Sequence, residues 1–187
     1  MKDQLRPAFT IFALLTIITG IIYPLGVTGI AQLLFPHQAN GSLIIMDGKL
    51  VGSMLIGQQF SDPKYFWGRP SVAGYDAAAS SGSNYGPMNP SLKETIQTRI
   101  NNLKADDPNN PLPIPVDLVT ASASGLDPHI SVAAAMYQVH RVATARRLSE
   151  VQVKLWVDEF TEGRQFGIFG EPRVNVLLLN LALDGIQ

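Results

Sequence analysis

The sequence predicts an α+β protein in which a single N-terminal transmembrane helix is followed by one mixed α/β soluble domain. Three observations carry this prediction: a long uncharged apolar segment near the start, a turn dipeptide between two short apolar runs, and later segments whose apolar residues recur at helical spacing. We place the boundary at Pro36, so that residues 1–36 form a tail and a membrane helix and residues 37–187 form the soluble domain.

The apolar segment at residues 7–36 contains no Asp, Glu, Lys or Arg. About twenty apolar residues suffice for a helix to cross the roughly 30 Å hydrocarbon core of a bilayer, and this segment is longer. A cleavable signal peptide is the alternative, because Lys2 and Arg6 make a basic start and Gly29 and Ala31 are small residues at a plausible cleavage site. The apolar part, however, exceeds the usual signal core of about 7 to 15 residues. We therefore predict a retained membrane helix, with a kink or a tighter turn near Pro24.

Charges on either side of the apolar segment predict its orientation. Lys2 and Arg6 lie shortly before it, whereas the first charged residue after it is Asp47. Because positively charged flanks are retained on the cytoplasmic side, the amino terminus is expected in the cytoplasm. Residues 37–187 then form an extracytoplasmic domain, and the lipid bilayer is the first partner that the sequence predicts.

A stripe of small and polar residues runs along the predicted membrane helix, with Thr16, Gly20 and Tyr23 at i, i+4 and i+7. In lipid, close backbone approach at such a stripe favours contact with another helix. The alternative is a lone anchor in which these residues are simply tolerated. Both interpretations stay open, and the three residues are candidates for partner binding.

Composition excludes several classes of function. The chain has no cysteine, which excludes disulfide bonds and thiolate chemistry. Its formal net charge is -1 and no basic face is evident, so nucleic acid is not an expected partner.

Short turn and loop signals organise the region after the membrane helix. Asp47 and Gly48 separate apolar runs at residues 42–46 and 49–56. A tight primed turn requires positive φ at both central residues, which this dipeptide accepts, so a β-hairpin is predicted. Residues 71–90 are rich in Gly, Ser, Ala and Asn and predict a long loop, either docked on a partner or mobile.

Capping signals predict three helices further along the chain. Ser91 and Glu94 match a capping box for a helix over residues 91–104, Ser131 caps a second helix, and Ser149 opens a third that runs to about residue 159.

Apolar runs predict the remaining elements. The runs at residues 116–120 and 174–178 are predicted as strands, and residues 179–184 as a closing turn or a short helix.

An aromatic cluster with a guanidinium beside it is formed by Tyr65, Phe66, Trp67 and Arg69. Such a cluster suits a protein interface, or an Arg stacked on an aromatic face. It is equally compatible with ordinary core aromatics and an Arg69 side chain that extends to solvent. The four residues are candidates for partner binding, with the core interpretation left open.

A small-residue loop at residues 121–129 precedes the helix capped by Ser131. Unpaired backbone donors converge where such a loop meets a helix amino terminus, which is a physically sensible anion or phosphate site. Ser122, Ser124 and Gly125 are the candidate residues for binding an anion or a nucleotide.

No catalytic set emerges from the motifs. The sequence has no GxxxxGK[ST], HExxH, GxSxG or DKTG pattern. His129, with Asp127 near it, and His140 are compatible with a general base or a metal site, but no ligand spacing supports one. We therefore predict no catalytic residues, no metal and no enzymatic activity. A membrane-tethered extracytoplasmic hydrolase or binding module is the alternative.

Ordered segments along nearly the whole chain resemble the KdpC family of potassium-transporting ATPase subunits. They are LRP at residues 5–7, QANGSL at 38–43, LIGQ at 55–58, YFWGRPS at 65–71, SGSN at 81–84, VTASASGLD at 119–127, RVA at 141–143 and VNVLLLNLALD at 174–184.

The resemblance implies a non-catalytic member of a high-affinity potassium uptake complex, Kdp, in the bacterial inner membrane. In such a complex a channel-like subunit transports the ion, a P-type ATPase subunit hydrolyses ATP, and a third, very small subunit lies in the membrane. The KdpC family stabilises the assembly of these other Kdp subunits.

The resemblance also implies a catalytic chaperone that raises the ATP affinity of the P-type ATPase subunit. The Ser/Gly-rich segment at residues 122–127 is likened to a nucleotide-transporter signature, which makes ATP a ligand by resemblance only. The predicted orientation argues against it, because an extracytoplasmic domain would not meet cytoplasmic ATP. We therefore expect no cofactor and rank docking on other subunits ahead of nucleotide binding.

Overall fold

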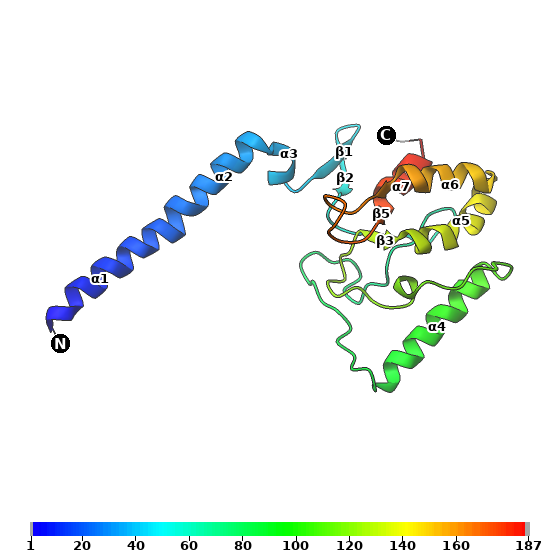
Figure 1. The fold of residues 1–187 in the computed structure, drawn as a ribbon, viewed down its shortest axis with the longest axis horizontal. Helices are drawn as coiled ribbons and strands as arrows, with labels where there is room; N and C mark the ends of the chain where they lie inside the picture. Colours follow the sequence, from blue (N-terminus) through cyan, green and yellow to red (C-terminus); the bar gives the residue numbers. More distant parts are fainter. Residues whose placement is uncertain (1, 186–187) are drawn as a thin grey trace. The chain divides into compact units, whose positions relative to one another are not determined.

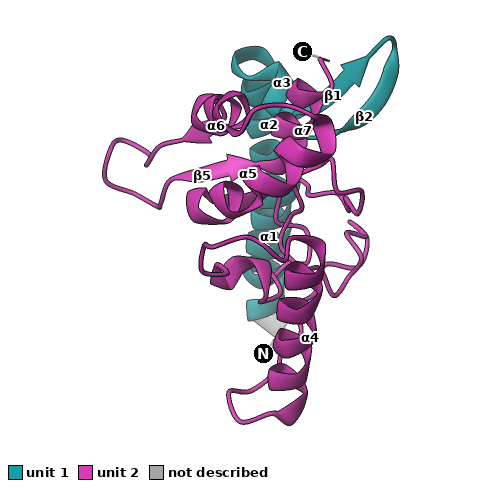
Figure 2. Ribbon diagram, turned by 90° about the vertical axis from the view of Figure 1, so that its right-hand side faces the viewer, with its two compact units in different colours: residues 1–53 teal, residues 54–187 magenta. Residues whose placement is uncertain are grey.

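The computed structural model describes residues 2–185, with side chains described from Gln4 onward. The chain divides into two compact units, Met1–Ser53 and Met54–Gln187, which are coloured separately in Figure 2. The predicted domain boundary at Pro36 stays a prediction.

The first unit begins with one continuous helix built from α1 (Lys2–Ile17), η1 (Ile18–Ile22) and α2 (Tyr23–Leu34), drawn in blue in Figure 1. Over Gln4–Leu34 it is 31 residues long, none of its most apolar window is buried, and it is the one helix within residues 2–185 that is long and apolar enough to cross a membrane. The predicted fold class, with a single N-terminal transmembrane helix, is therefore confirmed.

A π-helical turn interrupts this helix just before its internal proline. The Tyr23 N–H bonds the Ile18 carbonyl, five residues back, instead of the usual four. Pro24 follows and has no N–H to offer the Gly20 carbonyl. The predicted tighter turn is thus wrong: the helix is wider here, because a π-turn admits one extra residue where a regular hydrogen bond is missing.

The predicted hairpin is confirmed. After the single turn α3 (Pro36–Ala39), strand β1 (Leu43–Met46) pairs antiparallel with β2 (Lys49–Ser53). The connecting Asp47 and Gly48 have φ of 49° and 73°, as a primed turn requires.

The second unit packs helices against a small antiparallel sheet. Strands β3 (His129–Ser131), β5 (Arg173–Asn175) and β4 (Thr161–Glu162) lie in that order, and α5 (Val132–Arg146), α6 (Glu150–Glu159) and α7 (Val176–Leu183) pack beside them (Figure 1). The largest fully buried apolar side chains are Phe66, Ile130, Val139, Val142, Val153, Val157, Val174 and Leu179.

Two predicted caps are confirmed and one is wrong. The Ser131 side chain accepts from the Ala134 N–H, and Ser149 forms the predicted capping box with Gln152. Helix α4 (Pro90–Asp106), however, is capped by Asn89, whose side chain accepts from the Ser91 N–H. Proline is favoured at the first helical position, so the helix begins at Pro90 and the cap lies one residue further back.

Both predicted strands are wrong in whole or in part. Residues 116–118 form a 3₁₀ turn, η2 (Val116–Leu118). In the 174–178 run, β5 ends at Asn175, whose side chain accepts from the Leu178 N–H and starts α7. Short apolar runs fit strand and helix equally well, and here the cap decides. Strands β3 and β4 were missed because they hold only 3 and 2 residues.

Candidate functional site

Buried polar side chains in the second unit hold the backbone of the segment that carries the aromatic cluster. Asn180 accepts from the Phe66 N–H (2.8 Å) and donates to the Phe66 carbonyl (2.9 Å). Gln138 does the same for Trp67, at 2.8 and 3.1 Å. Each amide thus pairs with one residue as a neighbouring strand would, and both backbone groups of Phe66 and of Trp67 are bonded.

Two further side chains extend this arrangement. Asn175 donates to the Met54 carbonyl at 2.8 Å, and Arg141 donates to the Tyr65 carbonyl at 3.1 Å. Burial lowers the pKa of the Arg141 guanidinium to about 10, so the group stays charged at neutral pH. We refer to the four as the amide clamp: Gln138, Arg141, Asn175 and Asn180, all at most 6% exposed.

The hydrogen bonds of the amide clamp fix the backbone of residues 65–67, and with it the positions of the predicted aromatic cluster. Phe66 is fully buried in the core. Trp67 lies under the Arg141 guanidinium, whose carbon is 3.7 Å from the ring centroid, and its indole N–H donates to the Asp62 carbonyl. The stacked arginine is therefore Arg141, whereas Arg69 points to Asp127 at 3.1 Å.

Tyr65 is the member of the cluster that ends at the surface. Its hydroxyl donates to Asp184 at 2.8 Å, and Arg146 donates to the same carboxylate at 2.7 Å. The hydrogen bond to Asp184 is the main reason why the pKa of Tyr65 is raised. Burial acts to raise the pKa of Asp184, but the bonds from Arg146 and Tyr65 outweigh it and lower that pKa.

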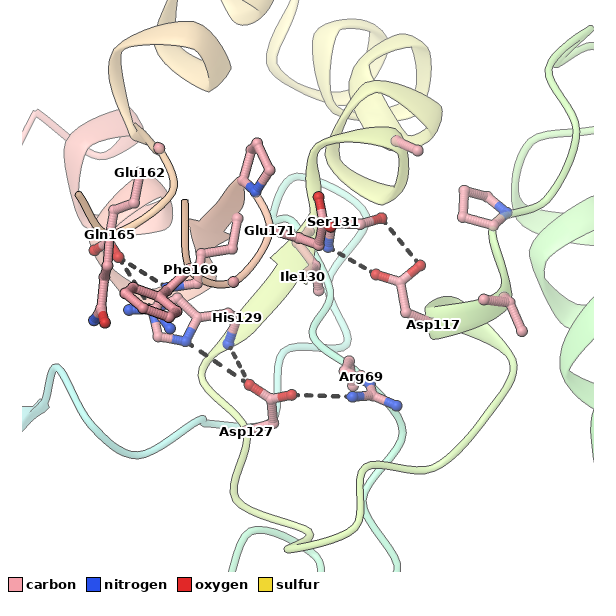
Figure 3. A pocket seen from close by; sticks show the side chains of 17 residues that line it. Arg69, Asp117, Asp127, His129, Ile130, Ser131, Glu162, Gln165, Phe169 and Glu171 are labelled. Carbon is pink, nitrogen blue, oxygen red and sulfur yellow. Dashed lines mark hydrogen bonds and ion pairs between the residues drawn. The ribbon is translucent and has the colours of Figure 1, made fainter. Parts of the chain in front are cut away.

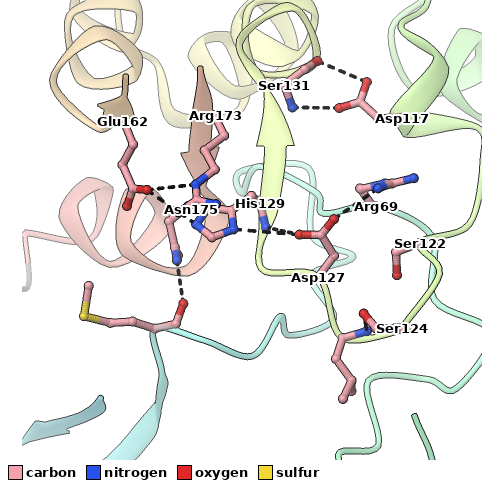
Figure 4. Close-up of polar contacts among 12 residues, drawn as sticks. Arg69, Asp117, Ser122, Ser124, Asp127, His129, Ser131, Glu162, Arg173 and Asn175 are labelled. Atoms are coloured by element: carbon pink, nitrogen blue, oxygen red, sulfur yellow. Dashed lines mark hydrogen bonds and ion pairs between the residues drawn. The ribbon is translucent and has the colours of Figure 1, made fainter. Parts of the chain in front are cut away.

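The predicted anion loop is bonded to the long loop at residues 71–90. The Ser122 hydroxyl accepts from the Gly125 N–H, and the Ser124 hydroxyl accepts from the Leu126 N–H. The Ser124 carbonyl accepts from the Ser81 N–H at 3.0 Å. The structure therefore brings Ser122, Ser124 and Gly125 into one bonded loop, in which the Gly125 and Leu126 N–H groups are already in use. Figure 4 shows Ser122 and Ser124.

Close backbone approach explains the glycine in this loop. Gly125 has φ +69°, and a Cβ on it would lie 2.8 Å from the Ser81 carbonyl oxygen. The helix amino terminus beyond is also occupied: Asp117 accepts from both the N–H and the hydroxyl of Ser131. Nucleotide binding at the loop stays a hypothesis from the resemblance alone, ranked behind docking on other subunits.

A cleft of about 740 Å³ lies beside β3 and the connection between β4 and β5 (Figure 3). Charges of alternating sign cross it: Arg69 contacts Asp127 at 3.1 Å, and the His129 ring lies 3.8 Å from Asp127 and 3.9 Å from Glu162. Glu162 in turn accepts from Arg173 at 2.9 Å. Asp127 and Glu162 thus each have an arginine partner.

The cleft offers little for acid–base or metal chemistry. Burial, with the nearby Arg173, lowers the pKa of His129 despite Glu162 and Asp127. His140 lies in another cluster, where it contacts Asp107 at 2.7 Å. Within the described residues, no group of three or more His, Asp or Glu is placed to hold a metal ion.

An exposed apolar tip borders the cleft, and the sequence patterns above do not indicate it. Phe166, Ile168 and Phe169 are 92%, 72% and 64% exposed, in the connection between β4 and β5. Two backbone bonds of 2.9 Å between Gln165 and Phe169 close the connection, so its shape does not depend on packing. We name Phe166, Ile168 and Phe169 the apolar tip. The one sequence signal is that large apolar residues alternate here with glycine.

An ion pair closes the base of the apolar tip. Arg164 contacts both carboxylate oxygens of Glu171, at 2.8 and 2.6 Å. Phe169 also lines the cleft, so the two features form one surface.

The predicted stripe on the membrane helix is exposed along its length. Thr16, Gly20 and Tyr23 are all exposed, and nothing lies within 4 Å of a Cβ built on Gly20. The π-helical turn rotates the faces before and after it relative to each other, so Tyr23 is displaced from the line through Thr16 and Gly20.

Comparison with known proteins identifies the family to which this chain belongs. A family model described as K+-transporting ATPase, c chain, matches residues 5–185. The chain belongs to the KdpC family. A potassium-transporting ATPase KdpC subunit from Dechloromonas aromatica is 64% identical over 190 residues, with all of both chains covered. Those from Herpetosiphon aurantiacus and Methylococcus capsulatus are 61% and 59% identical, with this chain fully covered and 98% and 100% of the relatives.

Membership confirms the resemblance found in the sequence. This KdpC chain is a membrane-associated subunit of a potassium-transporting ATPase, which implies that it works beside other Kdp subunits. A subunit of a complex contacts its neighbours through part of its surface, so we look for its function in side chains that are exposed in the isolated chain.

Proposed function

We propose that this KdpC chain is a non-catalytic accessory subunit that stabilises the assembly of its complex. Its partners are then the channel-like subunit, the P-type ATPase subunit and the small membrane subunit. The observation that carries the proposal is the apolar tip on the second unit, whose three side chains stay exposed in the part of the chain that the structure describes.

The tip has the properties of a binding anchor. Isolated apolar residues on a surface need no explanation, but three large exposed ones within four residues of one short connection do. The bonds between Gln165 and Phe169 and the pair between Arg164 and Glu171 hold the patch in shape before any partner arrives. Such preorganisation reduces the entropy lost on binding.

The surroundings of the tip favour a protein partner over a lipid surface. Glu162, Arg164, Glu171 and Arg173 flank it, so the local charges cancel. A membrane-binding loop gains affinity from an excess of basic residues next to anionic lipid, which this loop lacks. An apolar centre with a polar rim of both signs is the usual anatomy of a protein interface, and the cleft supplies that rim.

The second unit lies outside the cytoplasm in this proposal, because Lys2 and Arg6 precede the membrane helix and the next charge follows only at Asp47. The hydrogen bonds already made by Ser122, Ser124 and Gly125 also favour docking over nucleotide binding. An effect of this chain on the ATP affinity of the P-type ATPase subunit would then act through contacts between subunits.

Copurification from native membranes tests the proposal. The double variant F166S/F169S, made in the full-length chain, is compared with wild type for recovery of the channel-like and P-type subunits on the tagged chain. Loss of two aromatic anchors of about 1 to 2 kcal/mol each predicts at least about tenfold weaker recovery.

Leu155→Ser is the matched control, because Leu155 is 62% exposed on α6, outside the connection that carries the tip. It should leave recovery unchanged, and both variants should unfold within about 0.5 kcal/mol of wild type. If F166S/F169S recovers as much partner as Leu155→Ser does, the tip is not the docking surface.

A further inference from the structure

The β1–β2 hairpin of the first unit carries an exposed apolar surface. Leu43, Ile45 and Leu50 are 41%, 64% and 63% exposed. Ile45 and Leu50 are paired across the two strands, so their side chains lie on the same face. A two-stranded hairpin is marginally stable by itself in water, so this one requires a surface to rest on.

Hydrogen bonds join the hairpin to the end of the membrane helix. Gln32, in the last turn of α2, exchanges two side-chain bonds with Asn40, at 3.2 and 3.1 Å. Asn40 also donates to the Pro36 carbonyl at 2.7 Å. The turn that follows the helix is therefore held against it and does not act as a free hinge.

The same bonding continues into the strands. The Ser42 N–H donates to the His37 carbonyl at 3.0 Å, and the His37 ring contacts the Leu43 carbonyl at 3.3 Å. Ser53, at the end of β2, donates to the Gly41 carbonyl at 2.7 Å. Helix end, turn and hairpin thus belong to one bonded body, and the depth of the helix in the bilayer sets the height of the hairpin.

Helix length and sequence polarity put that height at the membrane interface. The helix Gln4–Leu34 has 31 residues, which at 1.5 Å each is about 46 Å, close to the roughly 40–45 Å of a bilayer with its headgroup regions. The apolar sequence ends at Phe35 and is followed by His37, Gln38 and Asn40, residues suited to the headgroup region. The hairpin begins directly after them.

We propose that the hairpin rests in the lipid interface beside the helix, with Leu43, Ile45 and Leu50 in contact with lipid. Its two charged residues, Asp47 and Lys49, lie at the turn and just after it, where they reach water. Because helix end and hairpin form one bonded body, the lipid contacts of the hairpin then help to fix the depth of the helix in the bilayer. Lipid is preferred to a partner strand because the hairpin is bonded to the end of a helix long and apolar enough to cross a membrane, which brings its apolar face to the bilayer surface.

Site-specific fluorescence tests the proposal in the full-length chain. Because the chain contains no cysteine, Ile45→Cys and Leu50→Cys each introduce a single site for an environment-sensitive label. The labelled chains are reconstituted into phosphatidylcholine vesicles with nitroxide lipids that quench at the headgroup or deep in the acyl chain. Asp47→Cys at the turn is the matched control, and Gly20→Cys marks the bilayer interior.

Labels at Ile45 and Leu50 should be quenched roughly twofold by the headgroup nitroxide and little by the deep one, since an interfacial face lies about 5–10 Å into the boundary. The label at Asp47 should be quenched mainly by aqueous iodide. The proposal is overturned if the labels at Ile45 and Leu50 are as open to iodide as that at Asp47. It is also overturned if lipid quenching at both sites disappears in the complete complex purified from native membranes, because a partner chain would then cover this face.

Discussion

The amide clamp and the apolar tip reverse the usual placement of polar and apolar side chains. Asn180 and Gln138 are polar and 1% exposed, whereas Phe166 is apolar and 92% exposed. A buried polar side chain is costly unless its bonds are made, and the clamp makes them to a backbone segment that has no strand partner of its own. An exposed apolar side chain indicates a partner outside the chain.

The two regions therefore differ in what they contribute: one to the stability of the fold, the other to binding. The clamp belongs to folding, because its partners lie in the same chain, more than a hundred residues away in the case of Asn180 and Phe66. In the function proposed above the tip belongs to assembly, and its shape comes from backbone bonds within its own connection. Variants in the first should change stability, and variants in the second should change binding.

The largest loss of stability is expected for Asn180→Leu. The substitution keeps the size of the side chain but leaves the N–H and carbonyl of Phe66 buried without partners. Each unsatisfied group costs about 1–3 kcal/mol, so the free energy of unfolding should fall by roughly 3 kcal/mol. Denaturant unfolding of the purified chain measures it.

Asn101→Leu on the exposed face of α4 is the control, with an expected change within about 0.5 kcal/mol. If Asn180→Leu and Asn101→Leu lowered the free energy of unfolding equally, the buried hydrogen bonds of the clamp would contribute no more to stability than an exposed asparagine does.

A smaller loss is expected for Gly125→Ala in the predicted anion loop. The positive φ and the approach of the Ser81 carbonyl to 2.8 Å from the new Cβ should destabilise the chain by about 2 kcal/mol. Gly163→Ala is the control, because nothing lies within 4 Å of a Cβ there.

Calorimetric titration of the same variants with ATP separates structure from binding. Wild-type chain should take up no ATP at physiological concentration. Saturable binding that Gly125→Ala abolishes and Gly163→Ala preserves would assign the loop to nucleotide instead.

The smallest effect on stability is expected from the titration of His129 in the cleft beside the tip. The pKa of His129 is lowered by burial and Arg173, although Asp127 and Glu162 face the ring. The folded chain therefore binds fewer protons than the unfolded chain below the ordinary value of 6.5. The stability that depends on this ring is complete above that pH and is lost as pH falls through the lower pKa of the folded state.

Thermal unfolding at several pH values checks this sign. His129→Gln cannot titrate, so its unfolding temperature should fall less than that of wild type between about pH 7 and pH 5. A steeper fall in the variant would mean that the protonated ring stabilises the fold through Asp127 and Glu162.

Local signals in the sequence were enough for much of the fold. The uncharged run predicts the membrane helix, Asp47 and Gly48 predict the hairpin, and Ser131 and Ser149 predict two helix starts. Each of these depends on neighbours within a few residues, so the sequence contains the whole cause. The KdpC resemblance could also be found from ordered motifs alone.

Only the tertiary structure decided which side chains face inward and which stay outside. The burial of Phe66 depends on Asn180, and the shape of the loop at Gly125 depends on Ser81. The glycines near Phe166 indicate a turn but do not distinguish a core aromatic from an exposed one, because burial depends on residues that fold next to it. Periodicity and capping therefore determined the elements and the membrane anchor, while long-range contacts determined the clamp and the cleft. The shape of the tip comes from bonds within its own connection, but its exposure depends on what folds beside it.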